Sequence, residues 1–196
     1  MAPLSVCVYC GSSPGLDPAF TDAARALGEA IVSGGHKLVY GGGHVGLMGV
    51  VADAVLAGGG EVHGVITEGL AYKEVGHDGL TVLDIVETMH ERKARMADLS
   101  DAVVMLPGGY GTLDEFFEAV TWTQLGIHAK PCGVLNVAGF FDPLLAFIEA
   151  AFEQRFIRDK HRDLLLVDDD IDSLLARLGE WQPPAGLDKW LDRTER

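Results

Sequence analysis

Positive charge is scarce in this chain of 196 residues, which carries 15 lysines and arginines against 29 aspartates and glutamates. The formal net charge at pH 7 is -14. Proteins that bind nucleic acids need a basic face to meet the phosphate backbone, so this balance argues against a nucleic-acid partner. A small anionic ligand is still compatible with it, because one pocket can be positive on an acidic protein.

Long hydrophobic runs are also missing from the chain. No apolar stretch approaches the ~20 residues that a membrane-spanning helix needs. The N-terminal segment MAPLSVCVYCGSS contains neither the basic region nor the long apolar core of a signal peptide. We therefore expect a cytoplasmic protein that has no membrane partner.

Cysteine occurs only three times, which is typical of a protein from a reducing compartment. Cys7 and Cys10 form a CxxC pattern, but the pattern falls inside an apolar, strand-like run. No second CxxC or Cys/His pair completes a set of zinc ligands. The sequence thus predicts buried, reduced thiols and no metal site.

Segments of strand and helix character alternate along the chain, and hydrophobic residues make up 48% of it, which favours a folded core. The predicted strands cover residues 4–10, 37–40, 61–66, 102–106, 131–136 and 164–167. The predicted helices cover residues 18–33, 47–57, 85–99, 112–125, a segment that begins at 142, and 171–178, whereas 71–81 shows little periodicity. We expect one domain over residues 1–181 and a tail over residues 182–196.

This alternation predicts an α/β fold with a mostly parallel sheet that is covered by helices on both faces. Such folds bind their ligands at the carboxyl ends of the strands. Three glycine-bearing turns follow predicted strands, at residues 10–13, 41–49 and 108–112. We expect these three turns to converge on one crevice.

The turn GGGHVG, residues 41–46, fits the GxGxxG pattern of dinucleotide-binding proteins. That fingerprint also needs an acidic residue at the end of the next strand. Glu61 has the right spacing but begins that strand, and Glu68 lies too far along the chain. Three interpretations stay open: a dinucleotide site, a tight turn, or a wall of a mononucleotide pocket to which Gly41 and Gly42 contribute.

The segment LPGGYGTLDE, residues 106–115, joins a predicted buried strand to a predicted helix. A helix N-terminus offers free N–H groups and a positive dipole end, and glycines let an anion approach the backbone. The segment lacks the GxxxxGK[ST] pattern, so ATP hydrolysis is not indicated. Thr112 and Glu115 also fit a T-x-x-E capping box, which is the alternative, purely structural explanation.

Three cations occur together in TMHERKARM, residues 88–96, within one predicted helix. A solvated helix face is the ordinary explanation of such a cluster. The helix nevertheless precedes the strand that leads to Gly108, so its residues could lean over the same crevice. Arg92 and Glu115 would then form an ion pair beside an anion-binding helix end.

Taken together, VYCGSS, YGGGHVGLMG, MHERKARM and PGGYGTLDE resemble the LONELY GUY (LOG) family of cytokinin riboside 5′-monophosphate phosphoribohydrolases. The resemblance runs from about residue 6 to residue 136. It implies a Rossmann-like three-layer α/β sandwich, a homodimer whose active site is shared between subunits, and no cofactor. The implied reaction hydrolyses the N-glycosidic bond of a small-molecule substrate, an N6-modified AMP, to free base and ribose 5-phosphate.

The resemblance also implies roles for individual residues. Arg92 and Glu115 match the catalytic residues of the family. The implied substrate-binding residues are Glu74, Met89, Lys93, Gly108, Gly109, Tyr110, Gly111, Thr112 and Thr121, with Gly41 and Gly42 beside them. In this scheme the glycine loop holds the 5′-phosphate, while Glu115 stabilises positive charge on the ribose and orients or deprotonates a water molecule.

Three other functions stay open at this point. The chain could be a non-catalytic mononucleotide-binding protein, a dinucleotide oxidoreductase or a lysine decarboxylase that uses pyridoxal phosphate. Decarboxylase chemistry needs the cofactor on a lysine. The lysines that precede the last predicted strand show no evident context for that bond: Lys37, Lys73, Lys93, Lys130 and Lys160.

Overall fold

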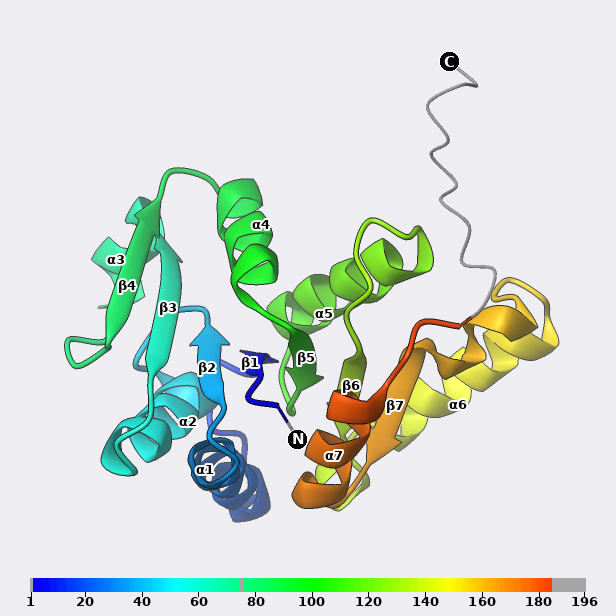
Figure 1. The fold of residues 1–196 in the computed structure, drawn as a ribbon, viewed down its shortest axis with the longest axis horizontal. Coiled ribbons are helices and arrows are strands. Elements are labelled where there is room, and N and C mark those ends of the chain that lie inside the picture. The colour runs from blue at the N-terminus through cyan, green and yellow to red at the C-terminus, as the bar shows by residue number, and fades with distance from the viewer. Residues whose placement is uncertain (1, 75, 185–196) are drawn as a thin grey trace.

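The computed structural model describes residues 2–74 and 76–184, without the side chains of residues 73 and 74. A parallel sheet of seven strands in the order β4-β3-β2-β1-β5-β6-β7 forms its centre (Figure 1). The strands are β1 (Ser5–Tyr9), β2 (Lys37–Tyr40), β3 (Val62–Thr67), β4 (Val82–Val86), β5 (Ala102–Met105), β6 (Cys132–Leu135) and β7 (Leu165–Asp168). This arrangement confirms the predicted α/β class and the parallel sheet.

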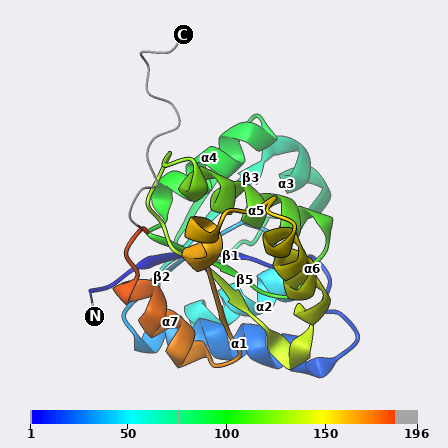
Figure 2. The same ribbon diagram turned by 90° about the vertical axis from the view of Figure 1, so that its right-hand side faces the viewer.

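Helices cover both faces of the sheet, as Figure 2 shows from the side. One face packs against α1 (Pro18–Ser33), α2 (Gly46–Ala57) and α7 (Ile171–Glu180). The other packs against α4 (Met89–Leu99), α5 (Tyr110–Gln124) and α6 (Asp142–Glu153), while the short α3 (Glu68–Glu74) follows β3. Short 3-10 turns span Val137–Gly139 and Asp159–Leu164. In the described residues no helix is both long and apolar enough to cross a membrane.

The central strand β1 shows why its sequence forms a buried strand. Val6 and Val8 face the layer of α1 and α2, whereas Cys7 and Tyr9 face the layer of α4 and α5. All four are nearly inaccessible to solvent, as expected for a parallel strand covered on both sides. The three cysteines of the chain are free and buried, which confirms that prediction.

Helix α1 begins and ends where its sequence predicts. The Asp17 carboxylate accepts a hydrogen bond from the Ala19 N–H at 2.9 Å, and Pro18 occupies the first helical position. Gly34 closes the helix, and Gly35 adopts a positive φ of 69°. Local capping chemistry therefore determines both ends of this helix.

The segment between β3 and β5 was predicted less well. The predicted helix over residues 85–99 is wrong in its first part, because residues 82–86 pair with β3 as an edge strand. Thr88 then caps α4, and its hydroxyl accepts from the Glu91 N–H at 3.1 Å while the Glu91 carboxylate accepts from the Thr88 N–H. Helix α3 also overlaps residues 71–81, which had been predicted as irregular. Most of the predicted tail, residues 185–196, lies outside the described residues.

The order of strands creates a crevice at the carboxyl end of β1. Chain connections run in opposite directions from β1, toward β2 on one side and β5 on the other, and this is the switch point at which α/β folds bind ligands. The Gly11 N–H donates to Pro107 O at 3.0 Å, and the Leu47 N–H donates to Gly11 O at 3.0 Å. The turns after β1, β2 and β5 therefore meet, as predicted.

Close packing of α1 on α2 gives a first testable prediction. A Cβ atom added at Gly28 would lie 2.6 Å from the Ala54 Cβ and 2.8 Å from Val51 O. Alanine is normally the better helix former, but here the overlap outweighs that gain. We expect Gly28→Ala to lower the free energy of unfolding by about 1–3 kcal/mol in a urea titration.

Gly69→Ala in α3 is the matched control, because a Cβ atom there meets nothing within 4 Å. This variant should be unchanged or slightly more stable. A Gly28→Ala protein as stable as the unmodified chain would contradict the packing argument.

Candidate active site

An ion pair between α4 and α5 lies at the crevice. Arg92 Nη1 donates to Glu115 Oε1 at 3.1 Å, and both side chains are largely buried. Arg92 Nε donates to Val65 O at 2.9 Å, and its Nη2 donates to Gly41 O at 3.1 Å. The guanidinium is thus held by α5, by β3 and by the turn after β2. The predicted pairing of Arg92 with Glu115 is present.

Gly41 owes its identity to this arginine. A Cβ atom at position 41 would overlap the Arg92 guanidinium, so only glycine lets the carbonyl approach it. The next residue, Gly42, has a positive φ of 75°. The glycines of the GxGxxG segment thus make a tight turn whose backbone forms the wall behind Arg92.

The N-terminus of α5 faces the same space. Gly109 is the N-cap and has no side chain to bond the first turn, so the N–H groups of the first helical residues have no partner within the helix. The capping box predicted for Thr112 and Glu115 is wrong. Thr112 lies inside the helix, which begins at Tyr110, and Glu115 bonds to Arg92 instead.

These groups surround a cavity of about 230 Å³. Gly109, Tyr110, Gly111 and Thr112 form one wall, and Arg92 and Glu115 form another. Five other lining residues were not predicted as site residues: Cys10, Gly11, Ser12, Met48 and Leu70. The turn that holds Cys10 and Ser12 had been predicted to reach the crevice, but Leu70 lies on α3, a helix that the pattern did not reveal.

Several other predicted site residues are not among those that line the cavity. The Met89 Sδ contacts Arg92 Nη1 at 3.4 Å, and Gly108 packs against Thr112 and lines a neighbouring hollow of about 270 Å³. The Thr121 hydroxyl donates to Phe117 O at 2.7 Å, two turns further along α5. Glu74 ends α3, but its side chain lies outside the described part of the structure.

Lys93 does not line the cavity either. Its Nζ lies 2.9 Å from Glu118 Oε2 and 3.2 Å from Asp114 Oδ2, both on α5. Burial lowers the pKa of Lys93, but hydrogen bonds to the two carboxylates outweigh that effect and raise it overall. Its assignment as a substrate contact stays a prediction.

The electrostatics of the cavity depend on Glu115. Burial raises the pKa of Glu115 above its usual range, and the Arg92 charge opposes that shift. Burial also raises the pKa of the Cys10 thiol, so this lining cysteine is not a thiolate nucleophile. Glu115 is therefore a carboxylate of this cavity that binds a proton more readily than an exposed glutamate does.

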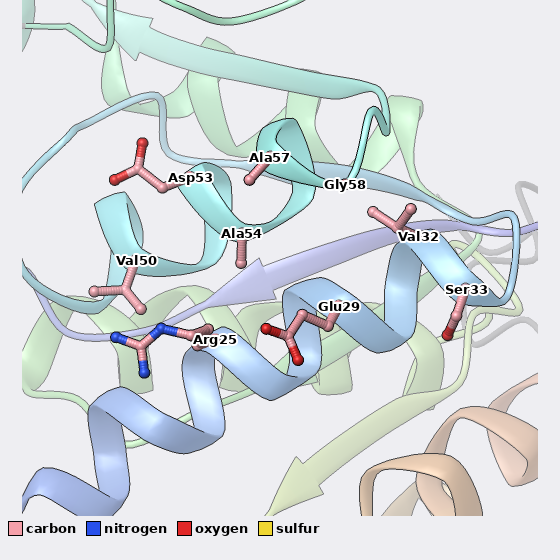
Figure 3. Close-up of a pocket in the computed structure, with 9 residues that line it drawn as sticks. All are labelled: Arg25, Glu29, Val32, Ser33, Val50, Asp53, Ala54, Ala57 and Gly58. Carbon is pink, nitrogen blue, oxygen red and sulfur yellow. The ribbon is translucent and has the colours of Figure 1, made fainter.

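A larger hollow of about 600 Å³ lies elsewhere, between α1 and α2 (Figure 3). Arg25 and Glu29 of α1 and Asp53 of α2 border it, over a floor of small residues that includes Ala54 and Ala57. Its residues come from the later turns of both helices, away from the carboxyl edge of the sheet. No group of three or more metal-ligating side chains occurs in the part of the chain that the structure describes.

Comparison with known proteins gives close relatives. Residues 48–178 match the family model described as possible lysine decarboxylase. The probable cytokinin riboside 5′-monophosphate phosphoribohydrolase LOGL9 of Oryza sativa subsp. japonica is 52% identical over 91% of this chain and 78% of its own length. The cytokinin riboside 5′-monophosphate phosphoribohydrolase LOG3 of Arabidopsis thaliana is 46% identical over 91% of this chain and 84% of its own length.

Solved structures share the fold at lower identity. The molybdenum cofactor binding protein from Rippkaea orientalis superposes with a TM-score of 0.68 and 18% identity, over 92% of this chain and 98% of that protein. The molybdenum cofactor carrier protein from Chlamydomonas reinhardtii superposes with a TM-score of 0.67 and 18% identity, over 91% of this chain and 97% of that protein. At this identity the likeness establishes the fold alone.

The Arg92 network gives a second testable prediction. In Arg92→Met, Glu115 keeps its buried position but loses its counter-charge, so we expect a loss of about 3–5 kcal/mol in the free energy of unfolding at neutral pH. The folded-state pKa of Glu115 lies above its usual 4.5, and this substitution raises it further. Below pH 4.5 the Glu115 carboxyl is protonated and does not lower the free energy of unfolding. The loss of stability appears as the pH rises through the folded-state pKa and the carboxyl ionises.

Urea titrations of both proteins between pH 4 and pH 8 measure the effect. The stability difference should shrink toward pH 4, and the double variant Arg92→Met, Glu115→Gln should recover part of it. A difference that does not change with pH would show that Glu115 carries no charge in the folded protein.

Proposed function

Because the chain belongs to the LOG family of cytokinin riboside 5′-monophosphate phosphoribohydrolases, we propose that it hydrolyses the N-glycosidic bond of N6-modified adenosine 5′-monophosphates. The products are the free base and ribose 5-phosphate. The observation that supports this most directly is the buried Arg92–Glu115 pair in one cavity with the N-terminus of α5.

The N-terminus of α5 is suited to a phosphate. The N–H groups of its first turn and the positive end of the helix dipole face the cavity, and Gly109 and Gly111 leave room at the backbone. Glu115 follows Gly111 by four residues, which is about 6 Å along the helix axis. A 5′-phosphate held at the first turn therefore brings the ribose beside the Glu115 carboxylate, and phosphate binding serves to orient the reacting carbon.

The chemistry follows from that placement. As the bond between C1′ and the purine nitrogen breaks, positive charge develops on the ribose, and the Glu115 carboxylate stabilises it. A water molecule adds to C1′, Glu115 accepts its proton, and the proton passes on to the departing purine. Arg92 keeps Glu115 ionised and fixes its position. The reaction needs neither a metal nor an organic cofactor.

The description of the matched family model suggests a different chemistry, which the described residues do not favour. A decarboxylase of this kind would need pyridoxal phosphate on a lysine. Among the lysine side chains that the structure describes, none lines the cavity. Lys93 is bound by two carboxylates, and Lys130 donates to Ala97 O at the end of α4.

We further propose that the active form is a homodimer in which each subunit helps to close the site of the other. Four large apolar side chains are exposed on α3, α4 and α5, which contribute residues to the cavity, and on the edge strand β4: Tyr72, Met89, Tyr110 and Ile85. Large apolar side chains of this kind are enriched at the interfaces between subunits. The three free thiols suit the reducing cytoplasm, where we expect the enzyme to act.

The proposed reaction is tested by incubating the protein with N6-isopentenyl-AMP, with AMP and with the riboside that lacks the phosphate. We expect chromatography to detect free base from the monophosphates alone, because the riboside lacks the group that α5 binds. Glu115→Gln should lower turnover by about 10²–10⁴-fold while AMP binding is retained. Turnover near normal in that variant would overturn the mechanism, and AMP binding without any base release would identify a non-catalytic nucleotide-binding protein.

The dimer is tested by light scattering coupled to gel filtration. We expect the unmodified chain to elute at twice its mass of 20.9 kDa. Ile85→Glu should yield monomers, because it places a charge in the apolar contact, whereas Phe147→Glu changes an exposed apolar residue on α6 and should leave the dimer intact. A monomeric unmodified protein that turns over the substrate would rule out the shared site.

A further inference from the structure

Arg92 and Lys93 are consecutive residues of α4, and both bond to α5. Arg92 contacts Glu115, while Lys93 contacts Asp114 and Glu118. Of these five side chains, only those of Arg92 and Glu115 line the cavity. The helices are therefore joined by two adjacent sets of ion pairs, one inside the cavity and one outside it.

The outer pairs bracket Glu115 on its own helix. Asp114 directly precedes it, and Glu118 follows Asp114 by one helical turn, so the two carboxylates lie on neighbouring positions of one face. The Lys93 side chain is 14% exposed and lies between them, with both distances at or below 3.2 Å. A lysine in this position fixes the rotation and height of α5 relative to α4 at the residue that carries Glu115.

We propose that Lys93 is a positioning residue, which docks α4 on α5 through Asp114 and Glu118 and thereby keeps Glu115 in contact with Arg92. The inference rests on the proposed function, since it assigns a role within that reaction. It differs from the role that the family resemblance implies, in which Lys93 contacts the nucleotide. In the structure the ammonium is already occupied by two carboxylates, and a phosphate would have to compete with both.

The same arrangement affects the charge of Glu115. Asp114 and Glu118 each favour the protonated form of Glu115 and so raise its pKa, while Arg92 and Lys93 lower it. The titratable groups that face Glu115 are Arg92 and Lys93 of α4, Asp114 and Glu118 of α5, and Cys7, Tyr9 and Cys10 on or directly after β1. Without Lys93, Arg92 alone would oppose the effect of the two flanking carboxylates on the pKa of Glu115.

Steady-state kinetics with N6-isopentenyl-AMP across pH 4–9 test the proposal. In Lys93→Met we expect kcat to fall about 10- to 100-fold, because Glu115 loses its fixed position. KM should change by less than about threefold, since no substrate contact is removed. The acid limb of the kcat profile should move to higher pH. Lys93→Arg keeps the positive charge. Its kcat and the pH of its acid limb should therefore stay close to those of the unmodified protein.

Two further proteins sharpen the test. Lys37→Met removes a lysine from the exposed pair with Glu61, at the amino end of β2. Its kcat, KM and acid limb should match those of the unmodified protein. Adding Asp114→Asn and Glu118→Gln to Lys93→Met removes the carboxylates that Lys93 balances. The acid limb should then return toward its original pH, a recovery that a lost substrate contact would not produce.

The outcomes separate the inference from the function on which it rests. A KM that rises at least tenfold in Lys93→Met, with an unmoved acid limb and no recovery in the triple variant, would overturn the positioning role and establish a substrate contact. An unmodified protein that releases no base would overturn the proposed function, and this role with it. Thermal unfolding of each variant verifies that it is folded.

Discussion

The buried guanidinium of Arg92 is the group on which the architecture of the cavity depends. A charge removed from water is tolerated only when its donors are bonded, and this one has three oxygen partners on three different elements. Each partner imposes a constraint. The Val65 carbonyl ties the arginine of α4 to β3, the Gly41 carbonyl requires a residue without a side chain, and Glu115 ties α4 to α5.

The parallel sheet brings the turns that form the cavity to one place, which the bonds of Arg92 alone do not explain. All strands point their carboxyl ends to one edge, so the turns that follow β1, β2 and β5 meet without any long connection. Helix α5 begins at that edge, and its positive end faces the cavity. An overall charge of -14 is thus compatible with an anion site, because the local attraction comes from backbone N–H groups and one arginine rather than from a basic surface.

Much of the fold could be predicted from the sequence, because alternating patterns and capping residues act locally, as at Asp17 and Pro18. The ion pair was predicted from two charged residues in separate motifs. The sequence contains two T-x-x-E motifs, at Thr88 and at Thr112, and it does not show which of them forms a capping box. In the structure the motif at Thr88 caps a helix and the motif at Thr112 does not. Glu115 is taken by Arg92, a partner 23 residues away, and no local pattern records that competition.

Among the described residues, those that line the cavity all lie in the first two thirds of the chain, between Cys10 and Glu115. Leu174, Leu175 and Leu178 of α7, in contrast, complete the core on the face where α1 and α2 pack. During translation the lining residues therefore leave the ribosome well before α7, the helix that completes this part of the core. During synthesis the core on this face of the sheet is completed only when α7 has emerged, although no residue of α7 lines the cavity.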